Sequence, residues 1–276
     1  MGKISNKYET TNLANLNDLK EVVRSEQAIA FIGAGCSVPL GYPSWSSLVK
    51  NLLDECEKNN PSLKNYIKDL RKETDLLFVA GLCKNYLGPK YNPYIKQIFG
   101  PKLKKCTDEH KIIMRLPFGR FITSNYDPSL DFAFQKVRDD LSEYFTHSNT
   151  SALSDFSIVT GTLKKTIFYM HGRYDNPEEI ILTETDYQQH YDFNQSYKET
   201  LKNIFSVYPV VFVGSSLTDV DFLAILRYIG ALFKHYPRGH FAILPYPKKL
   251  AEIEANKLKT KYNITPVFYK VKSMHD

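Results

Sequence analysis

Short apolar runs alternate along this chain with longer segments in which apolar residues recur every three or four positions. The short runs are typical of buried strands and the longer segments of helices. Strands are expected at residues 28–32, 118–122, 166–170, 180–183, 210–213, 241–244 and 266–269, with an edge strand near 157–160. Helices are expected between them at 15–25, 44–58, 128–136, 185–191, 194–207, 219–233 and 247–258. Because strands that alternate with helices pair in parallel, we predict an α/β fold, a Rossmann-like parallel sheet flanked by helices.

One long segment departs from this alternation. Residues 59–115 show no clear strand pattern, and Asn-Pro and Gly-Pro dipeptides separate its short helical patterns. The helices expected there are 62–71, 74–86, 91–99 and 108–115. We interpret the segment as a helical module inserted into a single domain that spans residues 1–276. The alternative is an ordinary helical layer over the sheet.

The most informative stretch is AIAFIGAGCSVPLGYPSW at residues 28–45. Its expected strand ends in Gly33-Ala34-Gly35, Ser37 follows, and Pro43 precedes the next helical pattern. A strand that turns into a helix through closely spaced glycines presents backbone N–H groups, and these bind phosphate together with the positive end of the helix dipole. Glycines after a strand also serve simply to turn the chain, so this motif alone does not decide the function.

Polar side chains follow three further expected strands. These residues are Asn125 and Asp127 in TSNYD, His171 before Gly172, and Ser215 and Ser216 after Gly214. The carboxyl ends of parallel strands form the crevice in which ligands bind, so we expect these side chains to meet the glycine loop. A single polar residue at a strand end is commonly a helix cap, and this alternative stays open for each of them.

The short motifs occur in the order found in one known family. They are GAG-x-S at 33–37, G-x-P at 41–43, T-x-N-x-D at 123–127, HG at 171–172 and G-[ST]-S-L at 214–217. Over roughly residues 26–245 the chain resembles the sirtuins, and most closely their bacterial branch of NAD-degrading antiphage-defence effectors. The resemblance implies NAD+ as substrate. It also implies a binding site made by Gly33, Ala34, Gly35, Ser37, Pro43, Asp127, Gly214, Ser215 and Ser216.

Two residues carry the expected chemistry. The neutral amide of Asn125 can hydrogen-bond a ribose hydroxyl and a water without competing as a base. A free imidazole titrates near neutrality, so a histidine at the position of His171 can accept a proton. In sirtuins the matching Asn lies against the nicotinamide ribose and the matching His is the general base, so the resemblance makes both residues catalytic. The alternatives are a helix cap for Asn125 and a buried structural role for His171.

Two departures from the sirtuin deacylases favour a different reaction. Those enzymes hold zinc with two C-x-x-C pairs and carry an Arg shortly after the G-x-P element, whereas this chain has no such Cys pair and has Ser46 at the Arg position. No metal is therefore expected. With no acyl group to attack the ribose, water is the expected nucleophile, and the products would be nicotinamide and ADP-ribose. A regulatory subunit that binds NAD or ADP-ribose with little turnover and a zinc-less deacylase remain the alternatives.

Composition and charge bear on the location of the protein and on its partners. The 276 residues include 43% hydrophobic and 24% charged residues and carry a net charge of +6. No apolar run is long enough to span a membrane, the N-terminal residues lack a signal-peptide core, and the four cysteines are widely spaced, so we expect a cytoplasmic protein with free thiols. Direct nucleic-acid binding is not expected. Because an enzyme that consumes NAD must be restrained, we expect a homo-oligomer, with residues 222–233 as one candidate contact, or a separate sensor or ATPase-type partner.

Overall fold

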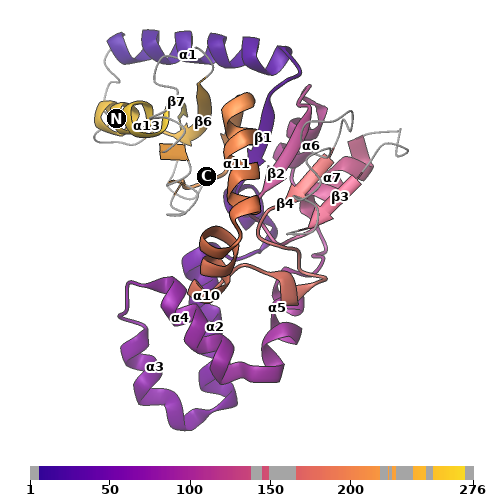
Figure 1. Cartoon of the computed structure of the whole chain (residues 1–276), viewed down its shortest axis with the longest axis vertical. Helices are drawn as coiled ribbons and strands as arrows, with labels where there is room; N and C mark the ends of the chain where they lie inside the picture. Colours follow the sequence, from indigo (N-terminus) through magenta and orange to yellow (C-terminus); the bar gives the residue numbers. More distant parts are fainter. Residues whose placement is uncertain are drawn as a thin grey trace.

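A seven-stranded sheet forms the centre of the protein (Figure 1). The computed structural model describes residues 6–137, 145–148, 166–217, 223, 226–227, 239–246 and 251–270. The strands are β1 (Ile29–Ile32), β2 (Arg120–Thr123), β3 (Phe145–Ser148), β4 (Thr166–Tyr169), β5 (Val210–Val213), β6 (His240–Pro245) and β7 (Ile264–Tyr269). Their order is β3-β4-β2-β1-β5-β6-β7, and every neighbouring pair is parallel. The predicted parallel α/β sheet is therefore confirmed.

The order of the strands reverses at β1. From β1 the chain adds β2, β4 and β3 on one side, and it later places β5, β6 and β7 on the other. The end of β1 at Ile32 is level with Thr123 of β2 and Val213 of β5. In an open parallel sheet the ligand crevice lies outside the carboxyl ends of the strands at such a reversal. The segments that follow β1, β2 and β5 are thus brought to one place.

Helices cover both faces of the sheet, because the side chains of each strand point alternately into two apolar cores. In β1, Ile29 and Phe31 belong to one core, and Ala30 and Ile32 belong to the other. The helices on the first face are α11 (Gln195–Val207) and α13 (Ala251–Tyr262), and those on the second are α1 (Asn6–Arg24), α6 (Asp108–Arg115) and α7 (Ser129–Val137). None of the helices in the described parts of the chain is both long enough and apolar enough to cross a bilayer.

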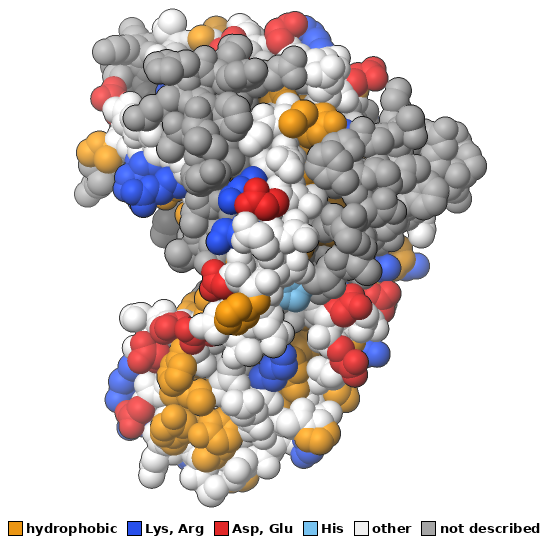
Figure 2. All heavy atoms as spheres, in the orientation of Figure 1, with side chains coloured by type: hydrophobic (Ala, Val, Ile, Leu, Met, Phe, Trp, Pro, Cys, Tyr) orange, Lys and Arg blue, Asp and Glu red, His pale blue; other side chains and the backbone are white. Residues whose placement is uncertain are grey.

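A helical module with its own apolar core lies below the sheet in the view of Figure 1. Its helices are α2 (Trp45–Asn59), α3 (Lys64–Leu70), α4 (Leu76–Leu87) and α5 (Tyr91–Phe99). The Asp75 side chain starts α4 by accepting a hydrogen bond from Phe78 N at 3.1 Å, as an N-cap does. Figure 2 shows hydrophobic side chains gathered on the face of this module that is turned to the viewer. Tyr66 of α3 and Phe78 and Tyr86 of α4 are exposed. The last helix of segment 59–115, α6, packs with α7 over the sheet rather than in the module.

The segment that leaves β4 passes along the module before it returns to the sheet. Ile180 and Leu182 are buried in the core of the module, and Ile181 N donates to His171 O at 2.9 Å. The strand expected at 180–183 is wrong, because this apolar run is buried against helices and pairs with no strand within the described residues. Two short elements follow it and lead into α11, namely α10 (Glu184–Tyr187) and the π-helix Gln188–Phe193.

The other six long strand predictions agree with the structure to within two residues at each end. The edge strand β3 at Phe145–Ser148 was not predicted, because the sequence FTHS has only one large apolar residue. The edge strand expected near 157–160 lies outside the described residues, as does most of the helix expected at 219–233 and therefore most of the candidate contact at 222–233.

Candidate active site

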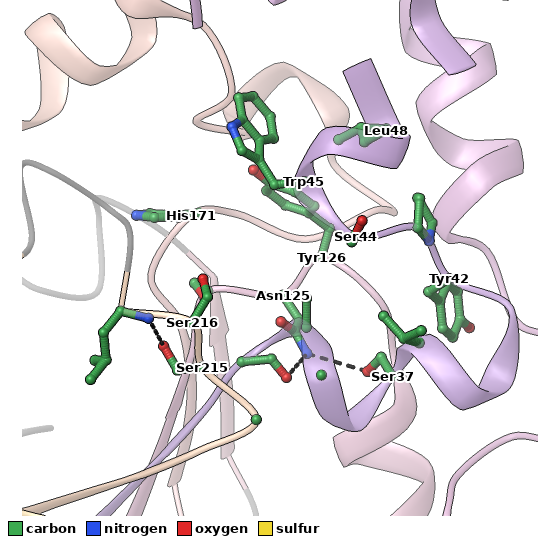
Figure 3. A pocket seen from close by; sticks show the side chains of 18 of the residues that line it. Ser37, Tyr42, Ser44, Trp45, Leu48, Asn125, Tyr126, His171, Ser215 and Ser216 are labelled. Atoms are coloured by element: carbon green, nitrogen blue, oxygen red, sulfur yellow. Dashed lines mark hydrogen bonds between the residues drawn. The ribbon is translucent and has the colours of Figure 1, made fainter. Parts of the chain in front are cut away.

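A cavity of about 710 Å³ opens where the ends of β1, β2 and β5 meet the helical module (Figure 3). Every residue that the sequence singled out for the site lines this cavity. They are Gly33, Ala34, Gly35, Ser37, Pro43, Asn125, Asp127, His171, Gly214, Ser215 and Ser216. Four separate stretches of sequence therefore contribute to one hollow, as their positions at strand ends predict.

Two glycine loops form one side of the cavity by direct backbone contact. Gly33 N donates to Val213 O at 2.9 Å, and Gly35 N donates to Gly214 O at 2.8 Å. A Cβ atom on Gly33 would lie 2.5 Å from Ser215 Cα, which is closer than any side chain tolerates. Gly214 has φ +65° and its backbone lies against Cys36. The glycines are needed here because the loops after β1 and β5 pack together without side chains between them.

The loop after β1 differs in one respect from the sequence prediction. It does not open directly into a helix but makes two short 3₁₀ turns, Ala34–Cys36 and Val38–Leu40, before α2 begins. The N–H groups of Gly33, Gly35, Cys36 and Ser37 donate to backbone carbonyls. Within residues 33–37, the Ala34 amide makes no backbone hydrogen bond to the parts of the chain that the structure describes. The Ala34 N–H is thus the group of this loop best placed to bind an anionic oxygen.

Cys36 is a packing residue of this loop. Burial, with smaller effects of Glu109 and Asp127, raises the pKa of its thiol to about 12. A thiol with such a pKa is not ionised near neutrality and is a poor nucleophile. Cys36 therefore packs against Gly214 and supports the contact between the two loops.

Asn125 is held by the glycine loop. Its Nδ2 donates to Gly33 O at 3.1 Å and to Ser37 Oγ at 3.2 Å, and its backbone N donates to Thr123 Oγ1 at 3.0 Å (Figure 3). The side chain is only 8% exposed. Because both Nδ2 hydrogens point to the loop, Oδ1 is the amide atom turned toward the cavity, where it can accept a hydrogen bond. The amide is a fixed acceptor rather than a freely rotating group.

Asp127 both lines the cavity and caps a helix. Its Oδ1 accepts a hydrogen bond from Ser129 N at 3.0 Å at the start of α7. Burial raises the pKa of its carboxyl, against the lowering effect of hydrogen bonds from Ser129 and Ser37. Asp127 therefore caps α7, as the helix-cap alternative predicted. Its carboxyl also lines the cavity.

His171 lies in the turn that follows β4, on the opposite side of the cavity from the glycine loop (Figure 3). The next residue, Gly172, has φ +85°, and a Cβ there would lie 2.6 Å from Glu179 O, so the turn requires glycine. His171 Nε2 lies 2.9 Å from the Tyr191 hydroxyl, and its ring packs edge-on against Tyr187 at 5.4 Å. The imidazole is 3% exposed, so its orientation is set by these neighbours.

Several cavity residues were missed by sequence reasoning. Aromatic side chains of the module and its borders line the cavity, and they are Tyr42, Trp45, Phe99 and Tyr126. Aromatic walls of this kind suit a flat ring. Tyr187, which also lines the cavity, was missed, and so was Tyr191, which contacts His171. Two tyrosines four residues apart in the segment TDYQQHYDF offered a signal. Within the described residues, no group of three or more His, Cys, Asp or Glu side chains could hold a metal ion.

Comparison with known proteins identifies the family. A SIR2-like domain matches residues 119–267, more than half of the chain. The chain belongs to the SIR2-like family. The family predicted from the ordered motifs is thus confirmed. The SIR2-like match begins just before β2, so it includes Asn125, His171 and the loop after β5. The glycine loop after β1 lies outside the match, and it reaches the site because β1 lies between β2 and β5 in the sheet.

Curated relatives of this SIR2-like chain have names that refer to NAD and to defence. The chain is 28% identical over 228 residues to NAD(+) hydrolase ThsA of Enterococcus faecium, covering 81% of this chain and 44% of the relative. It is 26% identical over 247 residues to NAD(+) hydrolase ThsA of Bacillus cereus (strain MSX-D12), covering 87% and 48%. It is also 26% identical over 225 residues to Defense-associated sirtuin 2 of Bacillus subtilis, covering 79% and 21%. The chain spans less than half the length of these relatives.

Proposed function

We propose that this SIR2-like protein is an NAD+ glycohydrolase, which cleaves the nicotinamide–ribose bond to release nicotinamide and ADP-ribose. One observation carries the proposal. The Asn125 amide and the His171 imidazole line the same cavity as the two glycine loops, which contact each other through their backbones. The relatives named NAD(+) hydrolase ThsA support the same substrate.

Cleavage of the nicotinamide–ribose bond requires the protein mainly to bind NAD+ and to orient the reacting groups. The nicotinamide ring departs as a neutral leaving group, and positive charge develops on the ribose as in other glycosidic cleavages. Asn125 Oδ1 is fixed as an acceptor and would orient a ribose hydroxyl or the attacking water. His171 would accept the proton that the water loses. The Ala34 amide and the hydroxyls of Ser215 and Ser216 would hold the phosphate and ribose groups.

Water is the nucleophile that fits this chain best. Ser46 replaces the Arg of the deacylases, and the sequence contains no C-x-x-C pair. The four cysteines are instead buried as free thiols in apolar surroundings. These features support hydrolysis over transfer of an acyl group to the ribose.

Incubation of the purified protein with NAD+, followed by HPLC, tests the proposal. We expect equal amounts of nicotinamide and ADP-ribose from the parent protein. Binding of NAD+ without release of nicotinamide would instead support a regulatory subunit, and release that depends on an acylated peptide would support a deacylase. An excess of cyclic ADP-ribose over ADP-ribose would contradict hydrolysis.

We further infer that the protein depletes NAD+ in the bacterial cytoplasm as an effector of antiphage defence. The relatives named for defence and for NAD hydrolysis support this role. Such an activity must be restrained in a healthy cell, so we propose control by self-association or by a separate sensor or ATPase-type partner. Light scattering and NAD+ turnover over a concentration series test self-association. A monomer whose specific activity is the same at every concentration and without any partner would contradict this control.

A further inference from the structure

Tyr191 reaches His171 from a segment that follows it by twenty residues. The two side chains are nearly inaccessible, with 2% of Tyr191 and 3% of His171 exposed. The Tyr191 hydroxyl lies 2.9 Å from His171 Nε2, which is hydrogen-bonding distance. Tyr191 lies in the π-helix Gln188–Phe193, and π-helical turns are rare and frequently occur at functional sites.

We propose that Tyr191 is a positioning residue for His171, whose hydroxyl partners Nε2 in both protonation states of the imidazole. This inference rests on the proposed function of His171 as the general base. With Nε2 held by the phenol, the ring nitrogen that takes the proton from water is Nδ1, and Nε2 carries a hydrogen throughout. The Tyr191 oxygen can then accept a hydrogen bond from Nε2 whether the imidazole is neutral or protonated. Tyr191 can therefore keep the ring in place while His171 gains and loses a proton.

The surroundings of Tyr191 fix its hydroxyl. Its ring stacks on Tyr187, with centroids 5.6 Å apart, and meets Tyr197 edge-on at 5.5 Å. The Tyr197 hydroxyl donates to Met170 O at 2.8 Å, the residue before His171. This second bond ties the same aromatic cluster to the end of β4. The Tyr191 hydroxyl is held without freedom to follow a displaced imidazole.

The helical module anchors the beginning of this segment. Asp186 Oδ2 accepts hydrogen bonds from Leu182 N at 3.2 Å and Thr183 N at 2.9 Å. The same carboxylate pairs with Lys84 of α4 through its Oδ1 at 3.0 Å. The position of Tyr191 is thus set partly by the module that forms the other wall of the cavity.

Tyr191→Phe tests the proposal, with Tyr197→Phe as the matched control. Both variants remove one buried phenol hydroxyl from the same aromatic cluster, but the Tyr191 hydroxyl bonds to the imidazole whereas the Tyr197 hydroxyl donates to Met170 O. Two properties would be measured for each variant that melts cooperatively. The first is the titration midpoint of the His171 imidazole in the ligand-free protein, followed by NMR of the labelled ring. The second is kcat for NAD+ as a function of pH.

We expect Tyr191→Phe to move the His171 midpoint and the acid limb of kcat to lower pH by roughly half to one unit. The reason is that a hydrogen bond to the protonated ring is stronger than one to the neutral ring. The kcat should fall about 10- to 100-fold with little change in KM. Tyr187 and Tyr191, which lie against the imidazole, are phenols, and a phenol ordinarily ionises near pH 10. The carboxyl groups of Asp75 and Asp127 line the same cavity and are unchanged in all variants. Their effect on the His171 midpoint is therefore the same in each protein and does not alter the comparison.

The outcomes separate this inference from the proposed function. An unchanged His171 midpoint in Tyr191→Phe, or an equal shift in Tyr197→Phe, would overturn the role of Tyr191. If Tyr191→Phe lowers kcat further in a His171→Ala background, the two residues do not act as a unit and the proposal is also wrong. A shifted midpoint in a protein that releases no nicotinamide would refute the NAD+ hydrolase and leave the His171–Tyr191 contact standing.

Discussion

Replacing Asn125 by Ala should abolish most NAD+ turnover while leaving a folded protein. The side chain joins the segment after β2 to the glycine loop through Gly33 O and Ser37 Oγ. Ala removes both hydrogen bonds and also removes Oδ1, the acceptor that faces the cavity. The substitution thus has a structural cost and a catalytic cost, which can be estimated separately.

The structural cost follows from the two lost bonds. At about 0.5–1.5 kcal/mol for each neutral hydrogen bond, the free energy of unfolding should fall by about 1–3 kcal/mol. For a protein of this size that corresponds to a decrease in Tm of roughly 2–12 °C. The catalytic cost should be larger, because loss of one fixed polar group that orients the reacting species lowers kcat by on the order of a hundredfold or more.

Asn59→Ala provides the control for Asn125→Ala. Asn59 ends α2, its Nδ2 donates to Glu55 O at 2.8 Å and to Glu55 Oε1 at 2.7 Å, and its Oδ1 accepts from Lys90 Nζ at 2.6 Å, so Ala also removes hydrogen bonds there, but away from the cavity. Both variants would be compared by thermal melting and by nicotinamide release at a temperature well below either Tm. We expect a lower Tm in both variants and a loss of kcat in Asn125→Ala alone. A folded Asn125→Ala protein with parental kcat, or an equal loss of kcat in Asn59→Ala, would refute the reasoning.

Three further substitutions test other parts of the account. His171→Ala should lower kcat by roughly 100- to 10,000-fold and remove the acid limb of the pH–rate profile, and an unchanged profile would make His171 structural. Gly33→Ala should destabilise the protein by about 1–3 kcal/mol, because its Cβ would lie 2.5 Å from Ser215 Cα. The control Gly81→Ala lies inside α4 with room for a Cβ and should raise the Tm. Equal effects of the two substitutions would contradict the close contact between the loops. Asp127→Asn should become progressively more stable than the parent as pH rises above about 4. The reason is that burial raises the pKa of the Asp127 carboxyl, so its ionised form is costly in the folded state. A constant difference in Tm between pH 4 and pH 8 would contradict this prediction.

The sequence predicted that the candidate site residues would line one cavity, because they lie at strand ends. The register between neighbouring strands is fixed by their apolar pattern, so Ile32, Thr123 and Val213 end level with one another. The residues that follow them must then meet. The glycines of the loops after β1 and β5 are visible in the sequence for the same reason, since only glycine permits the backbone contact that the sheet imposes.

The features that escaped prediction depend on packing across long stretches of sequence. The run at 180–183 has the composition of a strand, but the core of the helical module buries it instead. The aromatic wall at Phe99 and Tyr126 forms only when α5 docks against the loop after β2, where the two rings lie 4.9 Å apart. The hydrogen bond between Tyr191 and His171 requires the π-helix, whose register no simple 3.6-residue periodicity predicts.

Hydrolysis of NAD+ in water enriched in ¹⁸O is the most direct test of the central claim. Mass spectrometry would follow the release of nicotinamide and the isotope content of ADP-ribose in the same reaction, with Asn125→Ala and His171→Ala as controls. The account predicts one ¹⁸O atom in each ADP-ribose released, in a one-to-one ratio with nicotinamide, and little product from either variant. Nicotinamide release without ¹⁸O-labelled ADP-ribose, or undiminished release by both folded variants, would contradict it.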